Sequence, residues 1–179
     1  MTAIKPSYEI MTLLDGETIL RHIEVCGRVA YKSEWKIAGG TAESFVRFLI
    51  GRGHESVLEH YSFSVRFIVD RGVSHEIVRH RIASFTQEST RYCNYADGIN
   101  IIEPLFFSAD TDEYGAWQRA CETAEKCYRE MLTYGCTPQE ARAVLPTSTK
   151  TEVIMTTNLR EWRHFLRLRT DKAAHRLLI

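Results

Sequence analysis

The sequence predicts an α/β protein of α+β order, in which helices pack on a mixed or antiparallel central sheet. Two segments, 61–69 and 149–157, alternate apolar with polar side chains, which is the period of a half-buried strand. Three others, 17–31, 42–50 and 109–135, carry apolar side chains at helical spacing. The two strands lie far apart in the chain and helices of unequal length separate them, so we expect a mixed or antiparallel sheet.

The first half of the chain is predicted to contain two amphipathic helices and one of these strands. The helix over 42–50 is predicted to begin behind Thr41, because a threonine oxygen at the N-cap accepts a backbone N–H. In the strand at 61–69, phenylalanine and valine alternate with serine and arginine, so one face is expected to be buried. The apolar face of the helix over 17–31 consists of Ile19, Ile23, Cys26 and Ala30.

A turn at Asp70–Gly72 is predicted to follow the strand and to lead into a short helix. Ser74 is expected to cap this helix, which then covers 75–81. Residues 84–93 are predicted to be extended. A basic segment at 79–91 therefore begins at a helix end and continues into the strand after it.

The longest predicted helix, 109–135, has acidic residues in its first turn and ends at Gly135. Thr137-Pro138-Gln139-Glu140 forms a capping box with proline at the first helical position. This signal predicts a short helix that ends before Pro146.

The strand at 149–157 is predicted to lead directly into a final helix. Asn158, followed three residues later by Glu161, has the pattern of a capping box, and the helix is expected to run through Leu168. Thr170-Asp171 predicts the start of another helix, in which the chain stops.

Composition limits the classes of function. The 23 basic and 23 acidic residues cancel, so no overall positive field attracts nucleic acid or an anionic membrane, and any anion site is local. No segment approaches the roughly 18 apolar residues of a membrane span, which predicts a soluble, cytoplasmic protein. The five cysteines include no CxxC pair, which favours reduced thiols. The length predicts one domain, 1–179.

Several familiar sites are excluded by spacing. His54-Glu55 is followed by Leu58 where the zinc protease pattern HExxH needs its second histidine, so no metal is expected. Gly51-Arg52-Gly53 lacks the third glycine of a dinucleotide fingerprint and follows a helix pattern, so it is interpreted as a helix end. A GxxxxGK[ST] loop is also absent from the sequence, and side chains must therefore hold any phosphate.

The most informative segment is RHRIASFTQESTR, in which Arg79-His80-Arg81 is followed by Ser89 and Arg91. Clustered guanidinium groups repel one another unless an anion lies between them, and the planar arginine fork suits phosphate and carboxylate. Ser89 is a possible nucleophile with His80 as its base. The abundance of arginine favours instead a phosphate-binding surface, with the hydroxyl donating to an oxygen.

This segment resembles the signature of the flavin-dependent thymidylate synthases, also called the thymidylate synthase-complementing family. In that signature, RHR is followed after seven residues by a serine. Further blocks resemble this family in the same order along most of the chain. They are Tyr31-Lys32-Ser33, His54-Glu55-Ser56 with Glu59-His60, Glu76 to Tyr92, Arg142 to Pro146, Asn158 to Trp162, and Phe165 to Arg169.

The resemblance implies conversion of dUMP to dTMP, with methylenetetrahydrofolate as one-carbon donor and FAD, reduced by NADPH, as the source of hydride. It also implies the fold of that family and a homotetramer whose active sites are shared between subunits. Separate arginine clusters need not then meet within one chain. Members of the family continue further, so the chain is expected to be short at its C-terminus.

The family's functional residues are carried over by motif position. Arg169 is expected to stabilise negative charge on the uracil ring, since arginine keeps its proton, and no cysteine need attack C6. His54 is expected to lie near the isoalloxazine as a second catalytic residue. The positions implied for dUMP are Glu76, Arg79, Gln87, Glu88, Ser89, Thr90, Arg91, Arg142 and Arg169. Those implied for FAD are Ser56, Arg79, His80, Arg81, Gln87, Asn158, Arg160 and His164.

Two alternatives stay open. One is a flavin- and nucleotide-binding relative that is inactive or acts on another pyrimidine nucleotide, because such a protein would share most of the binding residues. The other is an RNA-binding module that uses the RHR segment on phosphates. The zero net charge and the lack of an exposed aromatic pattern of the RNA-recognition type disfavour it.

Overall fold

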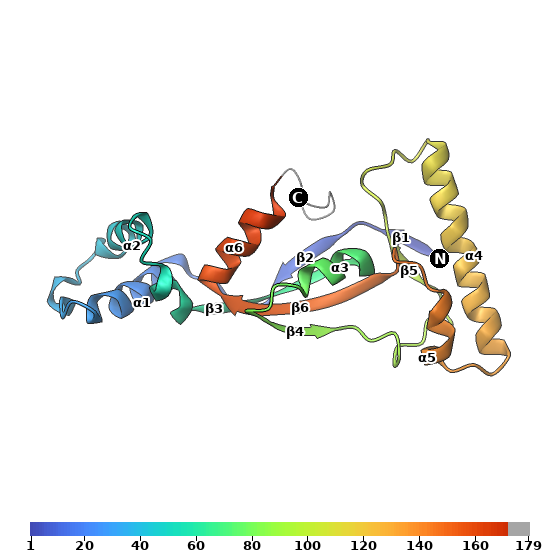
Figure 1. Cartoon of the computed structure of the whole chain (residues 1–179), viewed down its shortest axis with the longest axis horizontal. Coiled ribbons are helices and arrows are strands. Elements are labelled where there is room, and N and C mark those ends of the chain that lie inside the picture. Colours follow the sequence, from blue (N-terminus) through green and yellow to red (C-terminus); the bar gives the residue numbers. More distant parts are fainter. Residues whose placement is uncertain (172–179) are drawn as a thin grey trace.

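The molecule is elongated, with a sheet in the middle and helices at both ends (Figure 1). This computed structural model describes residues 1–171, so the helix predicted after Thr170-Asp171 lies outside the described residues. In chain order the helices and strands are β1 (Thr2–Ile4), β2 (Ser7–Ile10), α1 (Gly16–Val29), η1 (Glu34–Lys36), α2 (Thr41–Gly51), η2 (Glu55–His60), β3 (Ser62–Asp70), α3 (Arg71–Ile77), β4 (Ser84–Gln87), β5 (Asn100–Ile102), α4 (Asp112–Thr133), α5 (Pro138–Ala141), η3 (Arg142–Val144), β6 (Lys150–Asn158) and α6 (Leu159–Arg169).

The central sheet has the strand order β2-β3-β6-β4, and every neighbouring pair in it is antiparallel. β3 and β6 pair along their whole length, from Ser62 opposite Asn158 to Asp70 opposite Lys150. These are the two strands that the alternating pattern predicts, and the expectation of a mixed or antiparallel sheet with helices against it is confirmed. A separate parallel pair joins β1 to β5.

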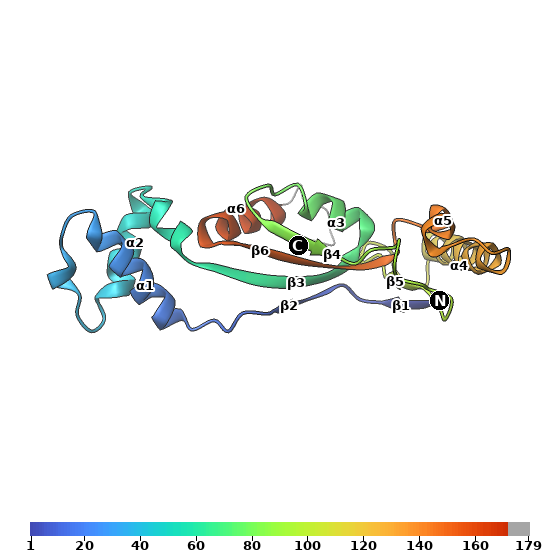
Figure 2. The ribbon, with the colours of Figure 1, turned by 90° about the horizontal axis from the view of Figure 1, so that it is seen from below.

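α3 and α6 lie on the same side of the sheet (Figure 2) and share its core. Val153 and Met155 of β6 are fully buried, and Trp162 and Phe165 of α6 pack on them. The Trp162 ring stacks on Phe63 of β3 with a centroid distance of 4.9 Å. Burying an aromatic side chain stabilises the folded state by about 1.5–3 kcal/mol, so these two residues hold α6 in place.

α1 and α2 form the lobe at one end of the molecule, around a small core of Ile23, Val46 and Leu58. The helices pack closely at Gly27, where an added Cβ would lie 2.8 Å from Leu49 Cδ1 and 2.9 Å from Phe45. The expected cap of α2 is wrong, because Gly40 occupies the N-cap position and Thr41 is the first helical residue. The Thr41 hydroxyl instead donates to the buried Glu24 carboxylate at 3.0 Å, linking the two helices.

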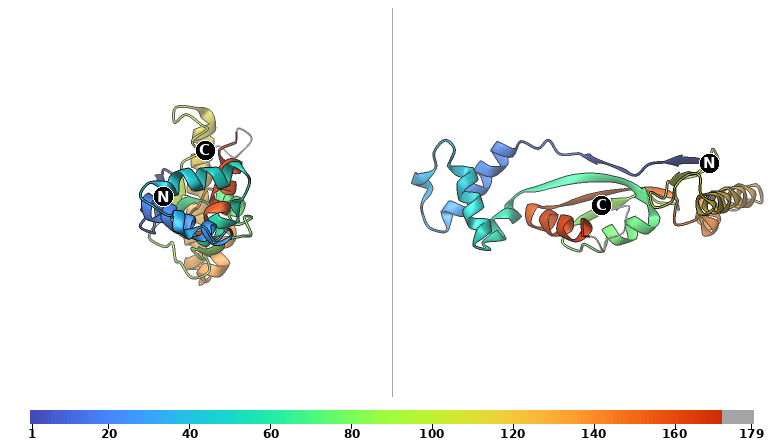
Figure 3. Two further views of the ribbon diagram at one scale, coloured as in Figure 1. Left: turned by 90° about the vertical axis from the view of Figure 1, so that its left-hand side faces the viewer. Right: turned by 90° about the horizontal axis from the view of Figure 1, so that it is seen from above.

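α4 and α5 lie at the opposite end from this lobe, as the two views of Figure 3 show together. α4 begins at its Thr111 cap, and a second core forms around the fully buried Tyr128. The predicted capping box from Thr137 to Glu140 is confirmed at α5. None of the helices within residues 1–171 combines the length and the apolar character needed to cross a membrane.

Two further local predictions around the RHR segment are wrong. α3 begins at Arg71 and ends at Ile77, so it does not cover 75–81. Its cap is Asp70, whose Oδ1 accepts from the Val73 amide at 2.6 Å, whereas Ser74 is buried inside the helix. A carboxylate at the strand end caps the helix one turn earlier than the predicted serine, and Arg79-His80-Arg81 therefore lies in the loop after it.

The extended segment predicted over 84–93 is also shorter than expected. β4 ends at Gln87, and the chain turns at Ser89, whose carbonyl accepts from the amides of Tyr92 and Cys93. The turn brings Thr90 and Arg91 to α5 and η3, where Thr90 accepts from Arg142 and Arg91 donates to Gln139.

Candidate active site

α6 has two chemically different faces. Trp162 and Phe165 face the sheet, while the opposite face carries four nitrogen-rich side chains at the i, i+3, i+4 and i+7 positions of one helical stripe. The helix begins where predicted, with Asn158 Oδ1 accepting from the Glu161 amide at 3.0 Å. The nitrogen-rich side chains are Arg160, Arg163, His164 and Arg167.

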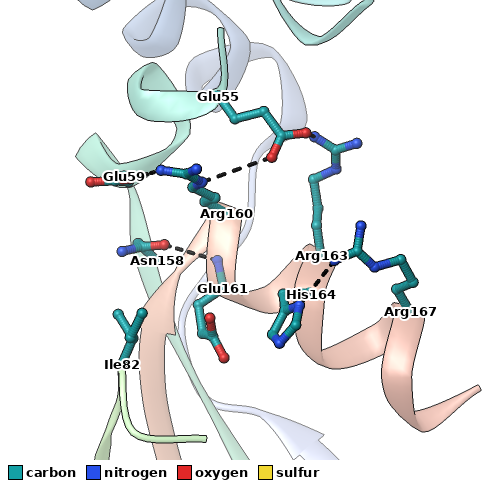
Figure 4. Close-up of a pocket in the computed structure, with 9 residues that line it drawn as sticks. All are labelled: Glu55, Glu59, Ile82, Asn158, Arg160, Glu161, Arg163, His164 and Arg167. Atoms are coloured by element: carbon teal, nitrogen blue, oxygen red, sulfur yellow. Dashed lines mark hydrogen bonds and ion pairs between the residues drawn. The ribbon is translucent and has the colours of Figure 1, made fainter. Parts of the chain in front are cut away.

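These four side chains line a hollow of about 620 Å³ (Figure 4). Its volume lies within the range of roughly 300–1,000 Å³ typical of ligand sites. The hollow contains Asn158, Arg160 and His164, three of the residues that the family resemblance assigns to FAD binding. The remaining lining residues are Glu55, Glu59, Ile82 and Glu161.

Carboxylates hold two of the guanidinium groups in this hollow. Arg160 Nη1 lies 2.5 Å from Glu59 Oε1, an ion pair that raises the Arg160 pKa, and Arg163 Nη1 lies 2.8 Å from Glu55 Oε1. Arg167 has no carboxylate partner within residues 1–171, and its Nη2 donates to His164 Nδ1 at 3.1 Å. Among residues 1–171, the hollow therefore has one arginine without a carboxylate partner and two whose charge an entering anion would share with glutamates.

His80 forms the centre of a buried network between the RHR loop and α6. Its Nδ1 lies 3.1 Å from Glu161 Oε1, and its Nε2 lies 3.1 Å from Arg169 Nε, 89 residues away in the chain. Arginine only donates, so Nε2 is the acceptor and Nδ1 carries the proton given to Glu161. Burial lowers the pKa of His80, the guanidinium of Arg169 adds to this, and the Glu161 hydrogen bond only partly opposes it. The imidazole is therefore neutral at physiological pH.

Arg169 itself is fixed on several sides. Besides the bond to His80, its Nη1 donates to Glu76 Oε2 at 2.8 Å and its Nη2 to the Glu76 carbonyl at 2.9 Å. Its side chain is 17% exposed, so the guanidinium is mostly removed from water. Within residues 1–171, these bonds use three of the five N–H groups of the arginine.

His80, Glu161 and His164 also have ligand atoms within 4.8 Å of one another, as a metal site would. Hydrogen bonds already use the lone pairs of His80 Nε2 and His164 Nδ1. A divalent ion would moreover lie beside two guanidinium charges, which repel it. We assign these residues to hydrogen bonding.

A second group of predicted residues meets near α5. Arg142 Nη1 donates to Thr90 Oγ1 at 3.3 Å, and Arg91 Nε donates to Gln139 Oε1 at 2.8 Å. The Ser89 hydroxyl accepts from the Arg91 amide at 3.3 Å. The turn thus combines hydroxyls, amides and two arginines, the donors that a phosphate monoester requires.

Gln87 and Glu88 are engaged within the chain. Gln87 Nε2 donates to Ser74 at 2.9 Å and to Thr151 at 3.2 Å. Glu88 accepts from the hydroxyl of the half-buried Tyr95 at 2.7 Å and from Lys150 Nζ at 3.0 Å. These bonds anchor the start of the Ser89 turn to the sheet.

The other predicted residues lie apart from these two groups. Arg79 and Arg81 are exposed on the loop after α3, flanking the buried His80. His54 precedes η2, and together with Ser56 it lines a separate hollow beside the α6 site. Within residues 1–171, no hydrogen bond or ion pair joins the Ser89 turn to the stripe on α6.

The sequence-based prediction of the site did not include Arg163 and Arg167 of the stripe. Both share the helical spacing of Arg160 and His164, so the period of α6 was the signal that could have identified them. Glu55 and Glu59 were not predicted as ion-pair partners either, because they approach α6 only through the tertiary fold.

Comparison with known proteins decides the family. The family model described as thymidylate synthase complementing protein matches residues 12–176. The chain belongs to this family. Similar members of the thymidylate synthase complementing family include proteins named flavin-dependent thymidylate synthase from Pyrococcus furiosus and Geobacter sulfurreducens, each 36% identical to it, over 159 and 141 residues.

The matches cover 82% and 78% of this chain, but the chain spans only 64% and 61% of the length of those two relatives. Among solved structures, the UMP/dUMP methylase PolB from Streptomyces cacaoi, bound with 5-Br dUMP, has a similar fold with a TM-score of 0.82. It is 26% identical, and the alignment covers 96% of this chain and 81% of PolB. The fold expected for the family is thus confirmed.

Proposed function

We propose that this chain is a flavin-dependent thymidylate synthase that converts dUMP to dTMP. In this proposal methylenetetrahydrofolate donates the carbon, and FAD, reduced by NADPH, is the cofactor. The names of its similar relatives and the nucleotide held by PolB support the reaction class. Bound FAD would supply the hydride, while the protein orients the reactants and provides charge.

The single observation that carries the proposal is the hollow on α6. Its volume and its mixture of guanidinium, imidazole and amide groups fit a large anionic cofactor, and Asn158, Arg160 and His164 would hold it. Arg167, which lacks a carboxylate partner within residues 1–171, offers a charge for the pyrophosphate. The buried His80 supports the same site from the RHR loop.

Arg169 is proposed to stabilise negative charge that develops on the uracil ring. Uracil C5 is a weak nucleophile until charge enters the ring, and a fixed guanidinium stabilises that charge without removing a proton. Glu76 and His80 hold the guanidinium before the substrate arrives, so little reorganisation is needed at the moment of reaction.

Ser89, Thr90, Arg91 and Arg142 are proposed to bind the phosphate of dUMP. Their donors converge on one turn beside α5, whereas the hollow lies along α6, and α5 and the start of α6 lie at opposite ends of β6 in Figure 1. We propose that a neighbouring subunit brings the two groups together in a homotetramer. The exposed apolar segment Ile10–Leu14, in which Leu13 is 92% exposed, supports an assembly surface on the sheet edge.

All five cysteines are free thiols, which supports a reducing, cytoplasmic location.

The test uses the purified full chain with FAD, NADPH, methylenetetrahydrofolate and dUMP. We expect a flavin absorption band that NADPH bleaches, formation of dTMP, and release of tritium from C5-labelled dUMP. The double variant Arg163→Ala/Arg167→Ala should weaken FAD binding by about tenfold or more, since each lost charge contact is worth about 1 kcal/mol. The control Arg47→Ala removes an exposed arginine of α2 and should bind FAD normally. A folded protein that binds neither FAD nor dUMP refutes the proposal.

A second candidate is methylation of UMP as well as dUMP, which the similarity to the UMP/dUMP methylase favours. UMP is assayed in parallel under the same conditions. Methylation of UMP at a comparable rate supports this broader activity, while turnover of dUMP alone excludes it.

A further inference from the structure

Glu88 is an acidic residue at a place where the proposed function calls for positive charge. It directly precedes Ser89, the first residue of the turn that is proposed to hold the phosphate of dUMP. A phosphate monoester carries a charge of about −1.5 to −2 at pH 7, and a neighbouring carboxylate repels it. The charge of Glu88 must therefore be compensated if the turn is to bind this phosphate.

Lys150 of β6 is the cation that compensates Glu88. Its Nζ lies 3.0 Å from Glu88 Oε2, and the two side chains are only 17% and 16% exposed, so water and salt screen the pair weakly. Lys150 Nζ also lies 2.6 Å from Glu152 Oε1. Glu152 has a second cation, Arg66 Nη1 at 3.6 Å, whereas Glu88 pairs with Lys150 alone in the part of the chain that the structure describes.

The alternation of the strands brings Glu88 and Lys150 to the same face of the sheet. Gln87 donates to Ser74 of α3 and to Thr151, so these side chains meet on the helix-covered face. Glu88 follows Gln87 and Lys150 precedes Thr151, which places both on the opposite face. Burial disfavours the charged form of Lys150, but its hydrogen bonds to Glu152 and Glu88 outweigh this and raise its pKa. Lys150 therefore stays cationic.

Tyr95 holds the other oxygen of the Glu88 carboxylate. Its hydroxyl donates to Glu88 Oε1 at 2.7 Å, and its amide donates to the hydroxyl of the fully buried Tyr128 at 3.3 Å. The side-chain bond between Glu88 and Tyr95 thus closes the loop of residues 89–94, which contains the phosphate turn. The carboxamide of a Glu88→Gln variant could accept the same bond without a charge.

We propose that Lys150 is a positioning residue for substrate binding, which compensates Glu88 and holds that carboxylate on Tyr95 so that the turn accepts the phosphate of dUMP. Lys150 acts through Glu88 and touches no substrate atom. The inference rests on the proposed function, which places the phosphate at Ser89. Removing Lys150 alone would leave a mostly buried carboxylate unpaired beside the phosphate, whereas removing both charges would not.

The first measurement is the Kd of dUMP for the full chain, by calorimetry. Lys150→Met should raise this Kd by about tenfold, because the uncompensated carboxylate repels the phosphate. Adding Glu88→Gln to that variant should restore the Kd to within about threefold of the wild-type value, because the charge is gone and the acceptor for Tyr95 remains. Lys126→Met, which removes an exposed lysine of α4, is the matched control and should leave the Kd unchanged.

The second measurement is turnover, in which Lys150→Met should raise the KM for dUMP and leave kcat and the KM for methylenetetrahydrofolate little changed. If Lys150 served only as a structural anchor, the double variant would bind dUMP no better than Lys150→Met. That result, or wild-type affinity in Lys150→Met, overturns the inference.

Two conservative variants keep the test decisive if Lys150→Met does not fold, which urea unfolding shows. Lys150→Arg retains the charge and should bind dUMP within about threefold of the wild type. Glu88→Gln alone retains Lys150 and should bind dUMP at least as tightly as the wild type. A tenfold loss of affinity in Glu88→Gln, on the order of 1.4 kcal/mol, contradicts the assignment.

The outcomes separate this inference from the proposed function. The expected pattern of Kd values in a chain that makes no dTMP keeps the role of Lys150 and refutes the reaction. Formation of dTMP by a chain whose dUMP affinity does not depend on Lys150 keeps the reaction and refutes the role. A folded wild-type chain that does not bind dUMP overturns both.

Discussion

Replacing Arg169 by lysine tests whether this guanidinium organises the centre of the site. The wild-type side chain makes bonds to His80, to the Glu76 carboxylate and to the Glu76 carbonyl. A lysine ammonium reaching Glu76 keeps the ion pair, but it cannot span the remaining partners because its charge is a single point. The variant therefore loses two hydrogen bonds and leaves His80 Nε2 buried without a donor.

The expected cost follows from those bonds. Hydrogen bonds that involve a charged group contribute about 1.5–3 kcal/mol each, so the loss of two predicts a destabilisation of about 3 kcal/mol. With a urea m-value of about 2 kcal/mol per molar, the unfolding midpoint should fall by about 1.5 M at fixed protein concentration. Arg47→Lys, on the exposed face of α2, should change stability by less than about 0.5 kcal/mol.

The same variant should retain FAD but lose turnover by about 100-fold, since it removes a preorganised donor from the proposed transition state. Urea titration, flavin absorption and the tritium-release assay measure these effects separately. Wild-type stability in Arg169→Lys would show that the network is not formed as described. Wild-type turnover of dUMP would remove Arg169 from the proposed chemistry.

Three other perturbations test single elements of the structure. Arg91→Ala should mainly raise the KM for dUMP, with kcat little changed, as expected when a uniform binding contact is lost; a large fall in kcat at unchanged KM contradicts this. Because burial lowers the folded-state pKa of His80 below its usual 6.5, stability should be constant above that pH and decrease as the pH falls below it, by at most about 1.4 kcal/mol per pH unit. Thermal melting should show this decrease, His80→Gln should lack the His80 contribution, and an identical slope in both proteins refutes the assignment. Asn158→Ala removes the α6 cap and should cost about 1 kcal/mol in urea unfolding, and no change would show that the cap is dispensable.

The parts of the fold that the sequence predicts correctly depend on neighbouring residues. The alternation in β3 and β6, the capping box of α5 and the Asn158 cap of α6 are all readable within one short segment. Where two local signals compete, the prediction fails. Asp70 and Ser74 are both acceptable caps, and the position of the β3 end selects the aspartate.

Strands β1, β2 and β5 were missed because pairing, not pattern, defines them. In β2, Tyr8 and Ile10 alternate with Ser7 and Glu9, but all four residues are exposed, and the strand is defined by its antiparallel ladder with β3. Four residues are the shortest run in which alternation indicates a strand, so the pattern of β2 by itself is too weak to identify it.

By itself, the sequence determined the chemistry available to this protein: an arginine-rich RHR segment, an amphipathic final helix and a cap that positions its first turn. Those features depend on residue type and on spacing within a few residues. Only the tertiary structure decided that Arg169 meets His80 across 89 residues, that Glu55 and Glu59 approach α6, and that Lys150 meets Glu88 across 62 residues. Contacts of this kind form because the sheet and its cores bring distant segments together, and no local pattern encodes that approach.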